Sequence, residues 1–309
     1  MGNDSHGNAN IELEKVPCNL CGGTDFRFLY KKPDTRYFVS DIEFNVVRCR
    51  NCGLAFVNPR PSMTSFESFY LPRFYEERGC DWRSVRYKKE ARYLADLKPG
   101  RVLDIGCAGG VFLKLLQDQG WEVYGMDFSS SGGNVYNLDI RYGDISDIQY
   151  QSDFFDCVTA WAVFEHLYDP IKYFKEVFRI LKPGGRFVFL VTNIRSLFSR
   201  YAYYEDIPRH LYFFSERTMK EYAKQCGLDV DKINFSNDIY SGKGAYALKV
   251  NVMRWLGISW KNIFNVPQQP PLVWSLDRGL TLLGRLLIWP RIEILLRCSG
   301  IMIVTMQKP

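Results

Sequence analysis

The chain has 309 residues and a net charge of +6, and its 47% hydrophobic and 24% charged residues are ordinary for a soluble globular protein. No apolar run approaches the ~20 residues that a transmembrane helix needs, which excludes a membrane-spanning protein. The first fifteen residues are polar, so we expect a disordered tail over residues 1–15 and no signal peptide. The expected location is the cytoplasm, where thiols stay reduced.

Two CxxCG repeats follow the tail and predict a zinc ribbon over residues 16–57. Four thiolates from two such turns form the closed tetrahedral ligand set of structural zinc, with no open position for catalysis. Between the repeats, FRFLY and EFNVV are typical of strands. Four unrelated buried cysteines explain the doublets less well. With no concentrated basic face, the ribbon is expected to be structural or to form a wall beside the substrate. The predicted zinc ligands are Cys18, Cys21, Cys49 and Cys52.

Residues 58–96 are rich in Phe, Tyr and Arg and predict a partly helical linker or cap. Its helical pattern breaks near Leu71-Pro72, because proline disfavours a helix at the residue before it. Tyr70 and Tyr75 either cover a ligand or pack between the ribbon and the core.

From residue 97 to residue 309 the pattern alternates strands with helices. Such alternation predicts an α/β fold, a Rossmann-like doubly wound and mostly parallel sheet, whose ligands bind at the carboxyl ends of the strands. The expected strands are 101–106, 121–127, 138–144, 155–161, 186–192, 228–236 and 300–309. The expected helices include 110–120, then 169–181 closed by KPGG, and one that begins after an N-cap at Ser215.

The stretch RVLDIGCAGG ends the first of these strands in a glycine-rich turn. A P-loop needs Gly-Lys-Ser/Thr at its end, which Gly109-Gly110-Val111 does not supply. A dinucleotide turn wants GxGxxG, and Asp104 would repel its pyrophosphate. S-adenosylmethionine carries cationic ammonium and sulfonium groups and no phosphate, so it suits this turn better.

Two further acids end the next two strands. Asp127 stands where a carboxylate can bind ribose hydroxyls, although NAD enzymes also use an acid there. Asp144 stands where it can accept a hydrogen bond from the adenine amino group, with Ile145 against the ring. The three acids together, rather than any one, favour S-adenosylmethionine.

The motifs VLDIGCAGG, VYGMD, RYGDI, FDCVTAWAVFEHLYDP and LKPGGRFVF resemble, in order and spacing, the class I S-adenosylmethionine-dependent methyltransferases over residues 97–231. The resemblance implies their fold, activity and cofactor. With the zinc ribbon and PRHLYFFS, the chain looks like the ribbon-bearing methyltransferases that modify sugars, lipids and secondary metabolites. The implied cofactor contacts are Asp104, Gly106, Cys107, Gly110, Asp127, Phe128, Asp144, Ile145 and Trp161.

The sequence departs from the family pattern at two places. Ala108 replaces the middle glycine of the turn, and it is small enough to be tolerated. The stretch FSSSGGNVYN after Asp127 is short and carries two glycines where a helix is expected. We expect that helix to be missing or distorted, which puts the adenine edge of the cofactor site in doubt.

A hydroxyl acceptor is helped by a general base, and histidine suits that role best. Of the three histidines, His6 lies in the expected tail, His166 follows Glu165 after the fourth strand, and His210 lies in PRHLYFFS. The predicted catalytic residues are His210, His166 and Glu165. His210 is either a base or substrate contact or a brace for its loop. Nearby tyrosines either line a sugar or aromatic site or pack, and these are Tyr201, Tyr203 and Tyr204.

The similar quinone O-methyltransferases can bind a divalent metal through an ExxEH array. Here Ala162 occupies the first position of the array. We therefore expect His166 to be metal-free and structural.

Residues 241–300 form an unusually long insertion before the last strand. From Ser241 to Pro309 there are nine Lys or Arg and two acidic residues. The insertion contains four tryptophans and the stretch TLLGRLLIWPRIEILLRC, which suits an amphipathic helix interrupted at Pro290. Three interpretations stay open: a helical lid or homodimer face, a peripheral membrane contact that presents a lipid-linked substrate, and a nucleic-acid surface. The last is disfavoured because the stretch is too apolar.

These observations predict a methyltransferase that O-methylates a small or lipid-linked, sugar-like or secondary-metabolite acceptor. An RNA methyltransferase and a non-catalytic cofactor-binding scaffold are the alternatives. The acceptor atom, whether O, N or C, stays open.

Overall fold

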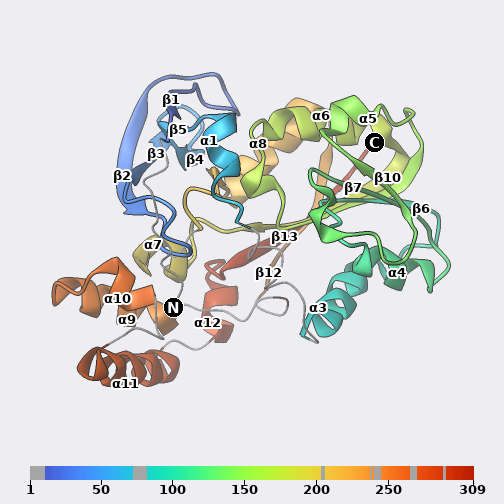
Figure 1. Cartoon of the computed structure of the whole chain (residues 1–309). Helices are drawn as coiled ribbons and strands as arrows, with labels where there is room; N and C mark the ends of the chain where they lie inside the picture. The colour runs from blue at the N-terminus through green and yellow to red at the C-terminus, as the bar shows by residue number, and fades with distance from the viewer. Residues whose placement is uncertain are drawn as a thin grey trace.

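The computed structural model describes residues 11–71, 82–202, 206–236, 239, 245–264, 270–287 and 290–309. Figure 1 shows a small N-terminal sheet, a large sheet with helices on both faces, and a group of C-terminal helices set apart at the lower left. Predictions for His6, Tyr75, Tyr203 and Tyr204 fall outside the described residues.

The N-terminal sheet has four strands in the order β11-β4-β3-β2. β2 (Phe26–Pro33) and β3 (Glu43–Cys49) are the strands predicted between the CxxCG repeats, and β4 (Ala55–Val57) follows the second repeat. The fourth strand, β11 (Tyr212–Phe213), comes from the PRHLYFFS stretch and pairs antiparallel with β4. This pairing was not predicted, because a strand of two residues carries no periodic signal.

The segment before the ribbon joins the fold earlier than expected. β1 (Leu13–Glu14) pairs antiparallel with β5 (Arg60–Pro61), and the side chain of Ile11 is buried. The backbone N–H of Glu12 donates to Ser65 Oγ at 2.9 Å. The predicted disordered tail is therefore wrong for residues 11–15, because burial of Ile11 and strand pairing hold them against the linker.

The linker is helical in parts, as predicted. α1 (Met63–Glu67) is capped by Ser62, whose side chain accepts a hydrogen bond from the N–H of Ser65. After the undescribed residues 72–81 come α3 (Trp82–Ala91) and the 3-10 turn η1 (Arg92–Leu94). α3 leads directly to the first strand of the large sheet.

The large sheet has seven strands in the order β12-β13-β10-β9-β6-β7-β8. All are parallel except β13, which runs antiparallel to both neighbours, so the carboxyl ends of the others lie at one edge. This is the predicted Rossmann-like, mostly parallel sheet. The strands are β6 (Arg101–Ile105), β7 (Glu122–Asp127), β8 (Asp139–Tyr142), β9 (Phe155–Trp161), β10 (Leu181–Thr192), β12 (Asp229–Ser236) and β13 (Ile301–Gln307).

β10 begins five residues earlier than predicted. Helix α6 (Pro170–Ile180) ends at Ile180, and the strand starts at once with Leu181. Its pairing with β9 shifts register between Leu181 and Arg186. KPGG is therefore an irregularity inside the strand, with Gly184 at a φ of 76°, rather than a loop that separates helix and strand.

Helices cover both faces of this sheet in Figure 1, with α5, α6 and α8 on one face and α3 and α4 on the other. Aromatic rings fill the first interface, where Phe174 stacks on Tyr222 and Phe187 stacks on Phe189. After β7 only the single 3-10 turn η2 (Ser130–Gly132) forms, which confirms the distorted helix expected there. The remaining helical elements are α4 (Val111–Gln117), α5 (Ile145–Ile148), η3 (Phe164–His166), α7 (Leu197–Ala202) and α8 (Glu216–Cys226).

The described residues of the insertion before β13 form four helices, whose small core also includes Phe198 of α7. They are α9 (Ala245–Trp255), α10 (Trp260–Phe264), α11 (Pro271–Leu287) and α12 (Pro290–Leu295). Ala247, Val250, Met253 and Ile263 are buried among them. α12 begins at the predicted interruption, Pro290. In the described part of the chain, no helix is long and apolar enough to cross a membrane.

Candidate functional site

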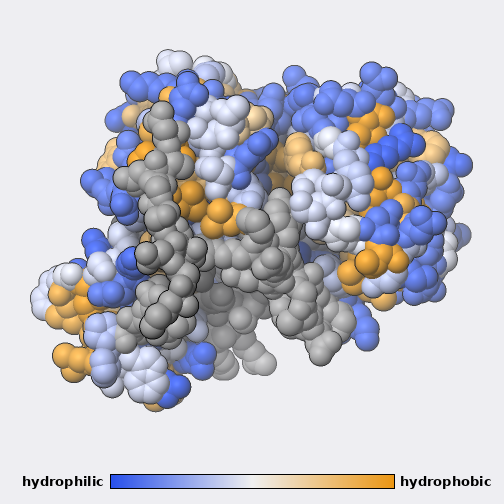
Figure 2. Space-filling view, in the orientation of Figure 1, coloured by the Kyte–Doolittle hydropathy of each residue, from blue (hydrophilic) through white to orange (hydrophobic). Residues whose placement is uncertain are grey.

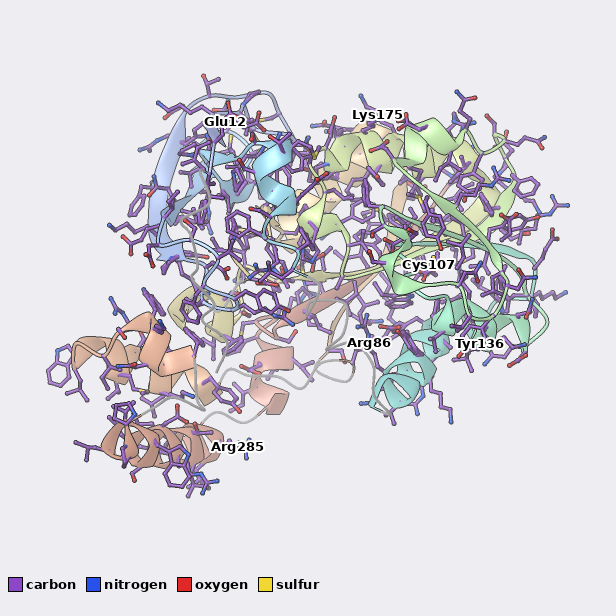
Figure 3. All side chains as sticks on the ribbon, in the orientation of Figure 1. Glu12, Arg86, Cys107, Tyr136, Lys175 and Arg285 are labelled. Atoms are coloured by element: carbon purple, nitrogen blue, oxygen red, sulfur yellow. The ribbon has the colours of Figure 1, made fainter. Side chains whose placement is uncertain are left out.

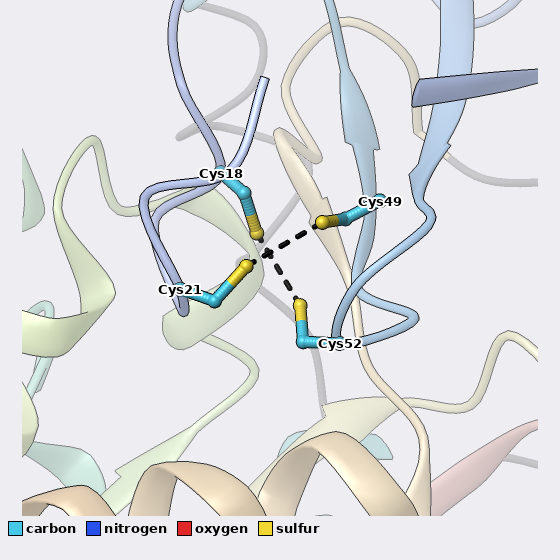
Figure 4. A group of neighbouring side chains, drawn as sticks. All are labelled: Cys18, Cys21, Cys49 and Cys52. Carbon is cyan, nitrogen blue, oxygen red and sulfur yellow. Dashed lines mark hydrogen bonds between the residues drawn. The ribbon is translucent and has the colours of Figure 1, made fainter. Parts of the chain in front are cut away.

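The four ribbon cysteines converge at one end of the N-terminal sheet (Figure 4). The Sγ atoms of Cys18 and Cys52 are 3.4 Å apart, and those of Cys21 and Cys49 are 3.5 Å apart. Gly53 follows the second pair with a φ of 86°, which lets the chain fold back so that its N–H donates to the carbonyl of Cys49. Four thiols in this arrangement are the ligand set of a closed, structural zinc site.

The ribbon is fixed to the large domain by buried polar contacts. The side-chain oxygen of Asn19 accepts hydrogen bonds from Tyr222 Oη at 2.9 Å and from the N–H of Ile171 at 3.1 Å. Arg209, with no exposed surface, pairs with Asp34 at 2.8 Å and with Asp206 at 2.6 Å. The ribbon and the PRHLYFFS loop are therefore held as one unit.

The glycine-rich turn after β6 is held by the end of β7. The N–H groups of Gly106 and Cys107 donate to the carbonyl of Met126. The N–H of Ala108 donates to Asp127 Oδ2 at 2.8 Å, and the N–H of Ser129 donates to Asp127 Oδ1 at 3.1 Å. The predicted ribose-binding carboxylate thus also holds the turn, and it keeps acceptor capacity because each carboxylate oxygen has two lone pairs.

The short segment after Asp127 packs directly on the turn. A Cβ at Gly109 would lie 2.7 Å from the carbonyl oxygen of Gly132, and a Cβ at Gly132 would lie 2.8 Å from the carbonyl carbon of Ala108. The backbone segments at Gly109 and Gly132 therefore lie so close together that neither position has room for a side chain. Ala108 itself has a φ of 47°, a conformation that costs a non-glycine residue roughly 1–2 kcal/mol.

The expected adenine edge differs from the prediction in detail. Asp144 caps α5 and already accepts from Ser146 Oγ at 2.7 Å, from Tyr173 Oη at 3.2 Å and from Lys172 Nζ at 3.1 Å. Ile145 has no exposed surface, so the prediction that it lies against the adenine ring is wrong, since it packs into the core. Phe128 is 55% exposed and offers the ring surface at this edge instead.

The acid of the first strand lies in a buried polar group. Thr159 Oγ1 donates to Asp104 Oδ1 at 2.6 Å, and burial together with the neighbouring Glu90 raises the pKa of Asp104 well above its ordinary value. Glu90 Oε1 accepts from Arg86 Nε at 2.6 Å, and burial raises the pKa of Glu90 to about 7 despite this pair. Figure 3 shows Arg86 between α3 and the sheet edge that carries Cys107.

Sequence reasoning missed Arg86 and Glu90. The polar helix WRSVRYKKEA precedes the glycine strand and carries an Arg–Glu pair at i,i+4. This spacing is common on solvent-exposed helices, so it did not indicate that Glu90 is buried beside Asp104.

The predicted catalytic residues come together at this edge. Ligand atoms of Glu165, His166 and His210 all lie within 4.8 Å of one another, and the two imidazole rings pack edge to face with centroids 4.6 Å apart. His166 Nδ1 lies 2.9 Å from the carbonyl oxygen of Arg209 and 3.1 Å from Tyr70 Oη. Since a carbonyl only accepts, the shorter contact puts the proton on Nδ1 and leaves the lone pair on Nε2.

Glu165 is fully buried, and His210 is partly buried. Burial raises the pKa of Glu165 to about 8 and lowers the pKa of His210 to about 4, so both side chains are neutral at pH 7. The structure therefore makes His210 a weak proton acceptor and a better hydrogen-bonding group.

Several buried polar atoms at this edge lack partners. Within the described residues, no hydrogen bond satisfies Glu90 Oε2, Trp161 Nε1, Thr192 Oγ1, His210 Nδ1 or either carboxylate oxygen of Glu165. Trp161 and Thr192 end β9 and β10, and the loop after Trp161 brings Val163 against Gly106. Buried polar groups are nearly always paired, so these atoms are candidates for contacts with a ligand or with water.

The same three side chains also have ligand types that hold a divalent cation, two imidazoles and a carboxylate. The ExxEH array is incomplete at Ala162, as the sequence showed, and His210 from a distant loop stands near the other two residues instead. Tyr70 contacts His166 and packs edge to face on Phe66, so both of its predicted roles stay open.

The comparison with family models matches residues 78–233, half of the chain, to a methyltransferase domain. The chain belongs to this methyltransferase family. This methyltransferase is 32% identical over 111 residues to a ubiquinone biosynthesis O-methyltransferase of Paracidovorax citrulli, covering 32% of the chain and 47% of the relative. It is also 32% identical over 114 residues to a probable S-adenosylmethionine-dependent methyltransferase of Mycolicibacterium smegmatis, covering 35% and 44%. The matched part spans less than half the length of these relatives.

Solved structures support the fold of this methyltransferase. One is an S-adenosylmethionine-dependent methyltransferase from Archaeoglobus fulgidus, with a TM-score of 0.50 and 21% identity, covering 76% of this chain and 98% of that one. Another belongs to the complex between the Haloferax volcanii Trm112 methyltransferase activator and a methyltransferase, with a TM-score of 0.51 and 20% identity, covering 79% and 97%. At these identities the likeness concerns the fold.

Proposed function

We propose that this S-adenosylmethionine-dependent methyltransferase O-methylates a small hydroxylated acceptor, sugar-like or a secondary metabolite, free or lipid-linked. The observation that carries the proposal is the group of unpartnered buried polar atoms around Glu165 and His210, beside the expected cofactor edge. Such atoms can bind an acceptor hydroxyl and hold it in a dry site. The ubiquinone O-methyltransferase relatives support an oxygen acceptor.

We assign the methionine end of the cofactor to the buried group around Asp104. Asp104 and Glu90 attract its ammonium, and Arg86, close to the carbonyl of Trp161, attracts its carboxylate. Burial holds both acids near neutrality until a cation arrives, because an isolated buried charge is unfavourable. Asp127 receives the ribose hydroxyls, and Phe128 covers the adenine.

The bound cofactor supplies an activated methyl group on a sulfonium, so the protein needs mainly to position and deprotonate the acceptor. His166 Nε2 carries the lone pair that takes the hydroxyl proton, because Nδ1 donates to the carbonyl of Arg209. His210 Nδ1 and the neutral carboxyl of Glu165 orient the acceptor by hydrogen bonds. This assigns His166, rather than His210, as the base.

Cofactor binding is tested by calorimetric titration with S-adenosylhomocysteine. Asp104→Asn should weaken binding by about tenfold or more, since it removes the charge that attracts the ammonium. Asp118→Asn is the matched control, because Asp118 is an exposed acid at the end of α4. Equal binding by the Asp104 variant and the native chain would overturn the assignment.

The base is tested by release of S-adenosylhomocysteine across a panel of phenols, catechols and sugars. His166→Gln should lower kcat by about 10²-fold to 10⁴-fold with sugar hydroxyls and less with the more acidic phenols, while cofactor affinity stays unchanged. A loss that is equal for all acceptors would assign His166 to positioning. A chelator treatment that leaves the ribbon zinc in place, as metal analysis checks, should leave the activity unchanged. Loss of activity with the ribbon zinc retained would favour a cation held by the three side chains.

We also propose that the four ribbon cysteines bind one structural zinc ion. The support is the convergence of their sulfur atoms and the absence of an open ligand position. Metal analysis of the purified chain should find one zinc per chain, and Cys18→Ser should remove it. A chain that folds and binds cofactor without zinc would contradict the proposal.

A further inference from the structure

The α11–α12 face is named for the two helices that carry its exposed apolar side chains. Its large side chains are all at least 40% exposed: Leu272, Leu282, Leu283, Leu286 and Leu287 on α11, and Ile292, Ile294, Leu295 and Leu296 on or just after α12. At 3.6 residues per turn, Leu272, Leu283 and Leu286 project away from the side where Asp277 and Gly284 are buried. Isolated exposed leucines are normal, but a contiguous stripe marks an interaction surface.

The charge around this face has one sign. Arg254, Lys261, Arg278 and Arg285 are exposed, whereas the two acids of the region, Asp277 and Glu293, are buried. Asp277 is paired with Lys249, so its charge is neutralised inside the unit. Figure 2 shows apolar and hydrophilic atoms interleaved over these helices at the lower left.

The arginines lie where an interfacial helix would need them. Arg278 and Arg285 are seven residues apart and occupy one flank of the leucine stripe on α11. Arg278 lies over the ring of Trp274 at 4.1 Å, and Trp274 is itself 41% exposed. Tryptophan and arginine beside exposed leucines form the pattern of a helix that lies in a lipid headgroup layer.

The C-terminal helices lead into β13 at the edge of the sheet that carries the candidate site. Because β13 is antiparallel, its first residue Ile301 pairs with Thr192, the last residue of β10, and with Ser236, the last residue of β12. Asn193 Nδ2 donates to the carbonyls of Arg297 and Ser299, which anchors the return of the chain. A surface bound by these helices would thus lie beside the acceptor edge rather than behind the sheet.

We propose that the α11–α12 face binds the surface of an anionic lipid bilayer. Leucine side chains enter the acyl boundary, and the arginines meet lipid phosphates. A second copy of the chain would bring the same basic rim against itself, and a nucleic acid would leave the leucine stripe in water. This goes beyond the proposed methyl transfer, because it needs no particular acceptor, and binding can be measured without turnover.

Flotation of the full chain with vesicles tests the proposal. Vesicles of phosphatidylcholine and phosphatidylglycerol should carry the protein, and pure phosphatidylcholine vesicles should carry at least about tenfold less. Added salt should weaken binding, since surface charge is screened. No flotation, or equal binding to both vesicles, would overturn the proposal.

Two variants separate the apolar from the basic contribution. Leu282→Ser with Leu286→Ser should weaken vesicle binding by about tenfold or more. Arg278→Gln with Arg285→Gln should weaken it by about fivefold per arginine, and these exposed polar changes keep the test valid if the leucine variant misfolds. Phe28→Ser is the matched control, because Phe28 is 57% exposed on the ribbon. Binding of S-adenosylhomocysteine checks each fold.

Light scattering measures the oligomeric state and so tests whether a second copy of the chain covers the α11–α12 face. A dimer that dissociates in the leucine variant, together with no flotation of the native chain, would assign the face to a second copy and overturn the lipid proposal. Salt-sensitive RNA binding that the arginine variant abolishes, again without flotation, would overturn it in favour of nucleic acid.

Discussion

The zinc ribbon and the C-terminal helices are both additions to the same sheet, and they attach to it in opposite ways. The ribbon is joined by a shared strand, β11, and by the buried Arg209–Asp34 pair. The helices share a small core with Phe198 of α7 and leave a row of leucines in water. The difference is consistent with the two proposals, that the ribbon frames the acceptor site and that the helices bind a lipid surface.

Loss of the proposed zinc site should have the largest effect. Cys52→Ser should abolish zinc binding and lower the unfolding temperature of the whole chain, not only of the ribbon, because metal binding is coupled to folding and the ribbon shares β11 with the large domain. Calorimetry with metal analysis measures this, with Cys226→Ser in α8 as the control cysteine. A main transition that stays at the native temperature would show the ribbon to be separable.

The buried ion pairs of the ribbon and of the C-terminal helices should differ in how much of the chain their loss destabilises. Asp34→Asn leaves Arg209 with only part of its counter-charge and should cost roughly 3–5 kcal/mol of global stability in denaturant unfolding. Asp277→Asn, in the pair with Lys249, should raise amide exchange only within the C-terminal helices. If the Asp277 variant destabilises the ribbon and sheet equally, the proposed independence of the helices is wrong.

The third prediction concerns pH at the site itself. The folded pKa of Glu165 is about 8, against ~4.3 in an unfolded chain, so the unfolded state releases its proton first as pH rises. Stability should therefore fall between about pH 4.5 and pH 8 and then level off. Glu165→Gln should flatten this fall by at most roughly 5 kcal/mol in unfolding free energy measured across that range, from 1.36 kcal/mol per pKa unit. Glu90→Gln should flatten the fall less, because the folded pKa of Glu90 is raised only to about 7. An unchanged dependence of stability on pH in the Glu165 variant would show that Glu165 does not have a raised pKa.

The smallest effect is expected on the exposed face. Leu286→Ser should change the free energy of unfolding by less than about 0.5 kcal/mol, because Leu286 is 75% exposed in the folded chain. Buried Leu190→Ser in β10 should cost several times more, since it also buries a hydroxyl. Both are read from denaturant unfolding. A large cost at Leu286 would show that the stripe packs against the chain itself.

Local patterns predicted the sheet, the ribbon strands, the glycine turn and the distorted helix after Asp127, because each is encoded within ten or so neighbouring residues. They also selected Glu165, His166 and His210, although only the fold shows that two segments over forty residues apart bring these side chains together. Two of the misses are long-range. Neither β11 on β4 nor the place of Glu90 beside Asp104 has a periodic signal. Ile145 was misplaced because a motif gives a residue's position along the strand and not the direction of its side chain.

The pairing of β11 with β4 has a consequence for synthesis. All four cysteines emerge from the ribosome long before Tyr212 and Phe213, so β4 must wait more than 150 residues for its neighbour. Until then its outer backbone groups are an open template for other strands. A nascent chain halted in that interval would present an aggregation-prone edge, and early metal loading would be the main protection available to it.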